Sequence, residues 1–246
     1  MKFNQLPPTV MEVCQAFVDG LEAILDVNLH GIYMHGASVF SDSGPIQDID
    51  CHVILAGPLS SRNKDAILQL QRDIAGRFPP LGGELDAYFI RYEDALKTGP
   101  PAHQLQSGIR DEAWALHCAH VRGGRYITLY GPPPADTFPA HSWDAISAAL
   151  EHELAFIEQN LQYPDYCVLN MCRIMFSVQE RNVVVSKFSS GKWASDRFPV
   201  WKPLIDAAVA SYLGTKTHDE AELLKNQAAA FIEFGKRRIR EELQRA

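Results

Sequence analysis

Two carboxylates lie close together in the first quarter of the sequence, after a turn of small residues. Asp48 and Asp50 are separated by one residue, and Gly36, the first residue of the segment Gly36-Ala37-Ser38, lies twelve residues before Asp48. Alternate side chains of a strand share a face, so an extended segment here points both carboxylates the same way. Neighbouring like charges favour the recruitment of a cation. Mg²⁺ suits such oxygen ligands best when substrate phosphates complete its shell.

The turn before the carboxylates could bind the phosphates of such a substrate. Gly36 allows the backbone to approach a ligand closely. The backbone amides of Ala37 and Ser38 could then point at a phosphate. A small-residue turn and a carboxylate pair together predict a nucleotide bound with a metal.

A third carboxylate, Asp86, lies on the next predicted strand, at 84–90. Strands are also expected at about 31–36 and 48–55, and if the strand at 84–90 lies beside the one at 48–55, Asp86 can join Asp48 and Asp50. The alternative is that Asp86, or Glu84, is a solvated edge residue.

Four further residues carry chemistry that the sequence leaves undecided. His52 falls on the carboxylate face of its predicted strand and could be a ligand, a proton relay or a polar residue satisfied by its neighbours. His117, Cys118 and His120 suggest zinc, but their spacing fits no zinc pattern. Ordinary packing or surface positions are the better interpretation of these three.

Composition restricts the class of protein and its partners. The chain has 246 residues, of which 46% are hydrophobic and 22% charged, as is typical of a globular protein. Its net charge of −7 argues against nucleic acid as a partner, so a polyphosphate must be held by local Lys or Arg side chains and by metal. Five scattered cysteines, and no apolar segment typical of a signal peptide or a membrane span, predict a cytoplasmic protein without a membrane partner.

Hydrophobic periodicity places helices along the rest of the chain. A proline-rich stretch at 131–141 predicts a domain boundary, with a first domain over 1–135 and a second over 136–246. The second domain is helical in pattern throughout, and its most apolar helix is expected to be central. The expected helices are 9–27, 61–78, 111–120, 143–161, 166–178, 203–213 and 219–244, with one more strand at 125–130.

Two sets of residues resemble one enzyme family. The glycine turn followed by Asp48-Ile49-Asp50 resembles the signature of the polymerase-beta-like nucleotidyltransferase superfamily. The apolar segment 167–177 with Arg173, followed by Ser186-Lys187 and Trp193, resembles the C-terminal helical domain of the aminoglycoside adenylyltransferases that modify streptomycin and spectinomycin. The resemblance covers nearly the whole chain and implies an α+β fold: a small mixed-sheet nucleotidyltransferase domain followed by an all-α helical-bundle domain.

The resemblance also implies roles for residues in both domains. It implies that Arg173 and Lys187 bind the nucleotide together with Gly36, Ala37 and Ser38. The residues alone leave Arg173 open, because a guanidinium in an apolar run needs an anion. That anion could be a triphosphate or a carboxylate such as Glu153 or Asp165.

The predicted reaction is metal-assisted transfer of AMP from ATP to a hydroxyl of a small acceptor, for which the resemblance implies an aminoglycoside. Asp48 and Asp50 bind one or two Mg²⁺ ions, and Asp86, also a metal ligand, accepts the hydroxyl proton. A non-catalytic nucleotide-binding or regulatory protein is the alternative, because Ala37 replaces the usual Ser and Asp86 is shorter than the expected Glu. Asp111, Glu112 and Trp114 are candidate lining residues for the acceptor, while the acceptor, the preferred nucleotide and the oligomeric state stay open.

Overall fold

The computed structural model describes residues 5–42 and 44–244. The chain divides into two compact units, one of residues 1–41 and 46–145 and one of residues 42–45 and 146–246. The boundary predicted after residue 135 stays a prediction.

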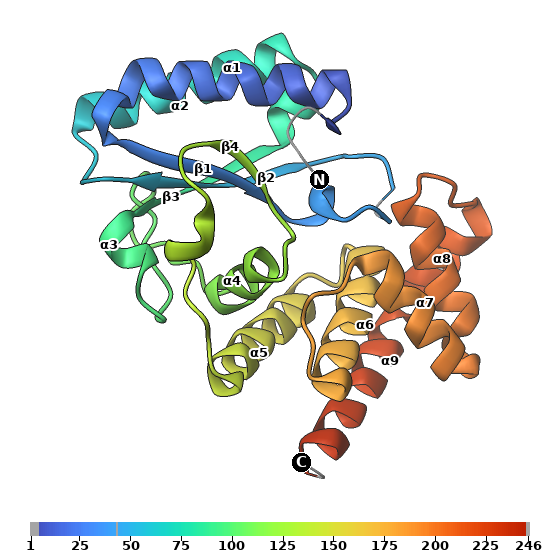
Figure 1. Cartoon of the computed structure of the whole chain (residues 1–246). Helices are drawn as coiled ribbons and strands as arrows, with labels where there is room; N and C mark the ends of the chain where they lie inside the picture. Colours follow the sequence, from blue (N-terminus) through green and yellow to red (C-terminus); the bar gives the residue numbers. More distant parts are fainter. Residues whose placement is uncertain (1–4, 43, 245–246) are drawn as a thin grey trace. The chain divides into compact units, whose positions relative to one another are not determined.

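A four-stranded sheet is the centre of the first unit (Figure 1). Its strands are β1 (Leu29–His35), β2 (Ile49–Leu55), β3 (Leu85–Arg91) and β4 (Ile127–Tyr130), in the order β3-β2-β1-β4. Strand β1 is antiparallel to both β2 and β4, whereas β2 and β3 are parallel. The sheet is therefore mixed, as predicted, and the strands carrying the carboxylates are neighbours.

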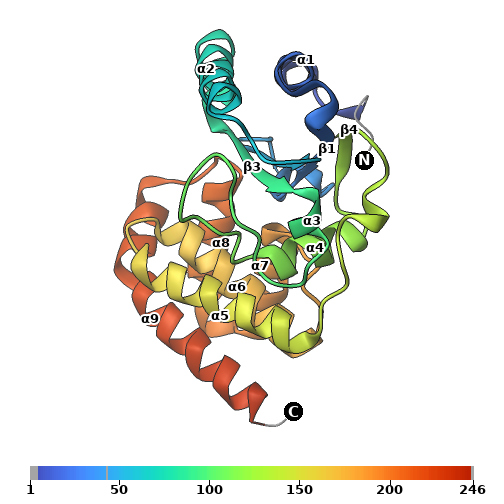
Figure 2. The same ribbon diagram turned by 90° about the vertical axis from the view of Figure 1, so that its left-hand side faces the viewer.

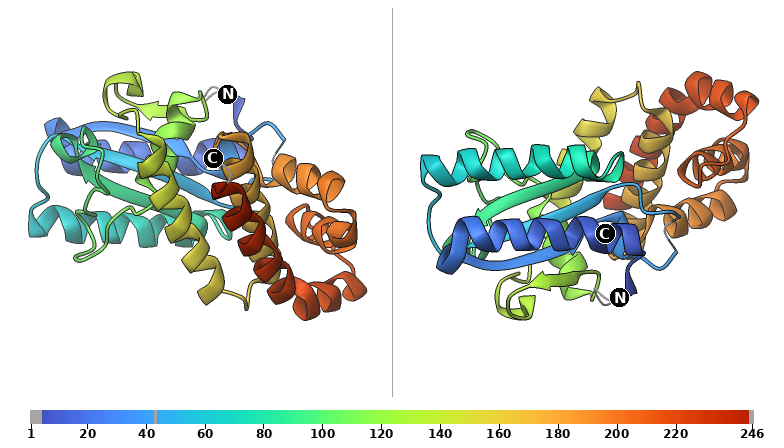
Figure 3. Two further views of the ribbon diagram at one scale, coloured as in Figure 1. Left: turned by 90° about the horizontal axis from the view of Figure 1, so that it is seen from below. Right: turned by 90° about the horizontal axis from the view of Figure 1, so that it is seen from above.

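Two helices cover one face of this sheet (Figure 2). They are α1 (Pro8–Leu25) and α2 (Ser61–Arg77), which run side by side across it (Figure 3, right). The Ser60 side chain caps α2 by accepting a hydrogen bond from the Asn63 amide at 3.1 Å. Helix α2 also supplies the crossover that a parallel β2–β3 pair requires.

Alternation along the strands explains the core beneath these helices. Ile49, Cys51 and Val53 of β2 and Ala87 and Phe89 of β3 pack into one hydrophobic cluster with the apolar side of α1. The intervening side chains of both strands must point to the opposite face. The predicted alternation in both strands is confirmed.

The opposite face of the sheet has a second, smaller core. Tyr33, Ile54 and Ile90 from the strands pack there with Trp114 of α4 (Trp114–Arg122) and with Phe138. The short helix α3 (Tyr92–Ala95) was not predicted, because its residues are mostly polar. The Trp114 indole nitrogen donates to the Lys97 carbonyl at 3.1 Å, which fixes the loop between α3 and α4.

The second unit is helical, as predicted. Its helices are α5 (Trp143–Gln159), α6 (Pro164–Glu180), α7 (Lys187–Arg197), α8 (Lys202–Tyr212) and α9 (His218–Leu243). Helix α6 packs against α7, α8 and α9, which confirms that the most apolar helix is central. Helix α7 was missed, because its serines and Gly191 hide the helical pattern. A Cβ at Gly191 would lie 3.1 Å from both Leu169 and Val209, so glycine allows α7 to pack closely on α6 and α8.

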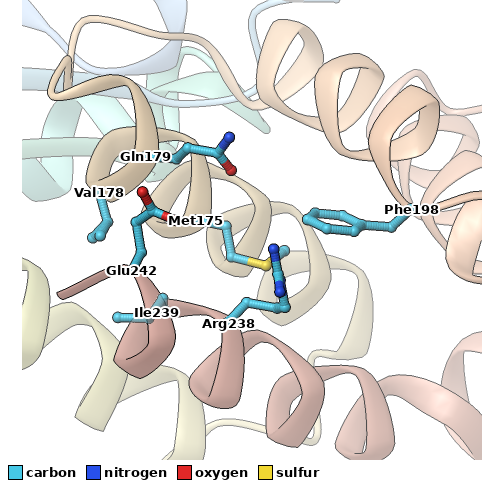
Figure 4. A pocket seen from close by; sticks show the side chains of 7 residues that line it. All are labelled: Met175, Val178, Gln179, Phe198, Arg238, Ile239 and Glu242. Atoms are coloured by element: carbon cyan, nitrogen blue, oxygen red, sulfur yellow. The ribbon is translucent and has the colours of Figure 1, made fainter. Parts of the chain in front are cut away.

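A small cavity of about 10 Å³ lies within the helical unit (Figure 4). Side chains of α6 and α9 together with Phe198 line it: Met175, Val178, Gln179, Phe198, Arg238, Ile239 and Glu242. This volume accommodates about one water molecule. The cavity is therefore too small for a nucleotide or an acceptor.

All five cysteines are free and buried. Among the residues that the structure describes, no helix is both long enough and apolar enough to span a membrane.

Candidate active site

Asp50 and Asp86 are side by side on the sheet. They are register partners in the parallel β2–β3 pair, which places their Cα atoms across one interstrand spacing of about 4.8 Å. Both side chains point away from the core under α1 and α2, because their sequence neighbours fill that core. Asp50 is half-buried and Asp86 is exposed. Two carboxylates thus share one face at the end of two adjacent strands.

Asp48 approaches the same strand end from outside the sheet. It lies in the segment just before β2 and is half-buried. No ion pair links Asp48 or Asp86 to a Lys or Arg side chain within the described ranges. The three carboxylates offer hard oxygen ligands, which fit Mg²⁺ by donor type.

Gly36 brings the turn after β1 directly against Asp50. Its φ of 76° lies in the left-handed region, which favours glycine. A Cβ at this position would collide with the Oδ2 atom of Asp50. Only glycine therefore allows this backbone to lie against the carboxylate.

The hydroxyl of Ser38 holds the turn in place. Ala37 and Ser38 belong to a short 3-10 helix, Ala37–Val39. Ser38 is buried, and its hydroxyl donates to the His35 carbonyl at 3.1 Å. A phosphate contact from Ser38 in this conformation would have to come from its backbone amide.

A cluster of histidines lies behind the carboxylates on the same face. His52 follows Asp50 by two residues on β2, and its Nε2 lies 3.0 Å from Oδ2 of Asp111. His117 Nδ1 lies 2.9 Å from the same oxygen. His35 stacks on His52 with ring centroids 4.1 Å apart. His52 therefore has a buried carboxylate as its partner, which fits more than one of the three roles that the sequence left open.

Burial and charge set the protonation of this cluster. Burial lowers the pKa of His52 despite the nearby Asp111, and burial together with His52 and His117 lowers the pKa of His35. Burial alone would raise the pKa of Asp111, but His117 and His52 together hold it well below its usual range. Asp111 is therefore ionised at neutral pH, and the imidazoles of His35 and His52 are neutral.

Two of the predicted acceptor-lining residues are buried instead. Trp114 has an exposed fraction of 0% and belongs to the second core. Asp111 is 5% exposed and is held by two imidazoles. The prediction that Asp111 and Trp114 line an acceptor surface is wrong, because the loop before α4 folds inward. Of the three predicted residues, only Glu112 stays half-exposed.

The grouping of Asp111 and His117 with His52 escaped sequence analysis. The residues come from β2, from the loop before α4 and from α4 itself. His52 and Asp111 are 59 positions apart in the sequence, so no local pattern links them. The only signal was the presence of His52 on the carboxylate face.

Arg173 lies in the helical unit, on α6. It is half-buried, and its Nη1 donates to Oδ1 of Asn170 at 3.3 Å. Burial lowers its pKa, whereas Glu153 raises it. The other proposed partner, Asp165, instead accepts from Ser211 and lies 3.6 Å from Lys216.

Lys187 is the first residue of α7, in the same unit. Its Nζ lies 4.9 Å from the centre of the Tyr166 ring and 6.0 Å from that of Tyr212. Ser186 caps α7, and its hydroxyl donates to Oδ2 of Asp42 at 2.5 Å. The start of α7 thus combines a lysine, a helix N-terminus and a bound carboxylate, which is an environment that favours anions.

Comparison with known proteins agrees with this architecture. Residues 137–238 match the model of the aminoglycoside adenylyltransferase C-terminal domain. The chain is 24% identical over 267 residues to spectinomycin 9-adenylyltransferase of Campylobacter jejuni, with 98% of each chain covered. The crystal structure of spectinomycin adenyltransferase AAD(9) from Enterococcus faecialis, solved with ATP and spectinomycin, has the same fold, with a TM-score of 0.76 and 19% identity over 93% of this chain and 98% of that one.

Structure and comparison confirm the fold that the sequence predicts. The predicted α+β fold, a small mixed-sheet domain followed by a helical domain, is confirmed. The chain is similar to aminoglycoside adenylyltransferases: its residues 137–238 match their C-terminal domain, and its fold is that of spectinomycin adenyltransferase AAD(9). Both of these relatives are named as adenylyltransferases, and so as enzymes.

Proposed function

We propose that this protein is a Mg²⁺-dependent adenylyltransferase that moves AMP from ATP to a hydroxyl of an aminoglycoside-type acceptor. The observation that carries the proposal is the register pairing of Asp50 with Asp86, with Asp48 entering the same strand end. The relatives named for spectinomycin support the acceptor class.

The metal would be held by Asp48, Asp50 and Asp86. When bound, Mg²⁺ neutralises the negative charge that develops on the transferred phosphate. The carboxylates contribute hard oxygen ligands, which Mg²⁺ prefers over nitrogen or sulfur. Gly36 keeps the turn backbone against Asp50 and so limits the directions that this carboxylate can take.

Asp86 would act as the general base. It is the most exposed of the three carboxylates, so an acceptor hydroxyl can reach it. Asp86 takes the hydroxyl proton, the hydroxyl oxygen forms a bond to the α-phosphorus of ATP, and the bond from that phosphorus to the bridging oxygen breaks. Pyrophosphate leaves, and AMP stays on the acceptor.

Nucleotide contacts are proposed for the turn in the first unit and, separately, for two cations of the helical unit. The amides of Ala37 and Ser38 are oriented by the buried Ser38 hydroxyl. Arg173 lacks a carboxylate within ion-pair distance in the described part of the chain, which supports a phosphate as its anion. Lys187, at the start of α7, adds positive charge to a helix N-terminus.

A pyrophosphate-release assay tests this function. Purified protein is incubated with ATP and Mg²⁺, with and without spectinomycin or streptomycin, and the adenylylated product is identified by mass. The proposal predicts release that depends on both acceptor and Mg²⁺. Calorimetry with ATP and Mg²⁺ is run in parallel.

The alternative is a non-catalytic nucleotide-binding protein on the same fold. Ala37 in the turn and the short Asp86 motivate it. ATP binding without pyrophosphate release across a broad panel of hydroxyl acceptors would favour this alternative. Absence of both binding and release would contradict both functions.

A further inference from the structure

His52, Asp111 and His117 bring three potential metal ligands to one point in the sheet domain. One ligand atom from each residue lies within 4.8 Å of the other two. His52 and Asp111 are buried, and His117 has an exposed side-chain fraction of 27%. One residue is therefore open toward solvent, which gives an ion a route of entry.

The distances suit a transition metal. The Asp111 oxygen lies 3.0 Å from His52 Nε2 and 2.9 Å from His117 Nδ1. Ligand atoms that each lie about 2.1 Å from an ion, at angles of about 90–110°, are about 3.0–3.4 Å apart. Both oxygen–nitrogen distances are therefore close to those between ligands of one ion, and the two nitrogens lie within 4.8 Å of each other.

An unpartnered nitrogen of a neighbouring ring adds a second observation. Nδ1 of His35 is buried and has no hydrogen-bond partner among the described residues. Buried polar atoms are rarely left unpaired in folded proteins. His35 stacks on His52, and its ring centroid lies 4.7 Å from that of His117, so this unpartnered nitrogen belongs to a ring packed against the cluster.

We propose that His52, Asp111 and His117 form a structural site for a divalent transition-metal ion of the zinc type, distinct from the carboxylate site for Mg²⁺. Two imidazole nitrogens and one carboxylate oxygen select Zn²⁺, or Co²⁺ as its substitute, over Mg²⁺. The ion would tie strand β2 to helix α4 and to the loop that precedes it. It would thereby hold the segment that carries the buried Trp114.

A hydrogen-bonded network is the simpler account of the same contacts. In that account Asp111 accepts one bond from each imidazole and no ion enters. The two accounts differ in the number of metal ions bound per chain. The proposal predicts stoichiometric uptake, whereas the hydrogen-bonded network predicts none. They do not depend on adenylyl transfer, so the test below is independent of the proposed function.

The test is a titration of chelator-treated protein with Co²⁺, read by visible absorption, and with Zn²⁺, read by calorimetry and by thermal unfolding. The proposal predicts one ion per chain, visible bands of nitrogen-coordinated Co²⁺ and a higher unfolding temperature with Zn²⁺. Saturating Mg²⁺ is present in a parallel series and should not displace the ion. Metal uptake below one ion per two chains would overturn the proposal.

Matched variants assign the site. His117→Gln changes the most exposed of the three ligands, so folding should persist, as circular dichroism will show. It should weaken Zn²⁺ binding by more than the roughly 10- to 100-fold typical of an outer-shell change. Asp86→Asn should leave Zn²⁺ binding unchanged. Binding that survives His117→Gln, or that is lost in Asp86→Asn, would contradict the assignment.

Discussion

Asp50 and Asp86 are register partners on the adjacent parallel strands β2 and β3, although 36 residues separate them in the chain. This relationship exists because α2 carries the chain back to the same end of the sheet. It turns two isolated carboxylates into one oxygen-lined site, in which Asp86 is the exposed carboxylate.

Asp86→Asn should lower adenylyl transfer by about 10²- to 10⁴-fold, the usual contribution of a general base. The amide keeps an oxygen toward the metal but cannot accept the proton, so ATP binding should persist. Steady-state rates and calorimetry with ATP and Mg²⁺ measure the two effects. Glu84→Gln, an exposed carboxylate two residues earlier, is the control and should keep full activity.

Gly36→Ala should disturb the carboxylate site through the backbone. The new Cβ meets Oδ2 of Asp50, and the positive φ adds strain of about 1–3 kcal/mol. Transfer should fall strongly and need more Mg²⁺, as an activity titration against Mg²⁺ will show. Gly124→Ala has a similar φ of 77° but nothing near its Cβ, so it should cost stability without raising the Mg²⁺ requirement. Equal Mg²⁺ requirements in the two variants would refute this explanation.

Arg173→Met tests whether the guanidinium on α6 serves the nucleotide. Removing a cation whose burial lowers its pKa should leave the free energy of unfolding unchanged or slightly higher. ATP affinity should fall by about 10- to 100-fold, the value of a charge-assisted hydrogen bond. Lys192→Met removes one exposed positive charge from α7 and serves as the control. If both variants bind ATP as the unchanged protein does, Arg173 has only a structural role.

Asp165 should make the stability of the protein sensitive to acid. Burial would raise its pKa, but hydrogen bonds from Ser211 and the Tyr166 amide, with Lys216 nearby, lower it below the ordinary value. A lowered folded-state pKa contributes stability above the unfolded value of about 3.9, and that contribution disappears as the pH falls through the folded value.

Asp165→Asn should therefore be less stable than the unchanged protein at pH 7, and the difference should shrink below about pH 4. Urea unfolding at several pH values measures it. Asp196→Asn, an exposed carboxylate on α7, should show a much smaller effect. A difference for Asp165→Asn that stays constant from pH 7 to pH 3 would contradict this account.

The strands were predictable because Ile49, Cys51 and Val53 alternate with polar residues, and these three side chains fill the core under α1 and α2. Helix α6 was predictable from its apolar length. Helix α7 was missed because its stability comes from packing around Gly191 rather than from local preference.

The residues of the candidate site also fall into those that the sequence predicts and those that it does not. Asp48, Asp50 and Asp86 could be selected because each lies at a readable position in a strand or beside one. The contacts of Asp111 with His52 and His117 depend on how one loop folds under the sheet, which no local spacing reveals. The same inward fold buries Trp114 and explains why it was misassigned.

The most direct test of the central claim is a crystal structure with a non-hydrolysable ATP analogue and Mn²⁺ in place of Mg²⁺, whose anomalous signal locates the ion. We predict an ion bound by the carboxylates of Asp48, Asp50 and Asp86 and by phosphate oxygens of the analogue. A bound analogue with no ion at these three side chains would contradict the account.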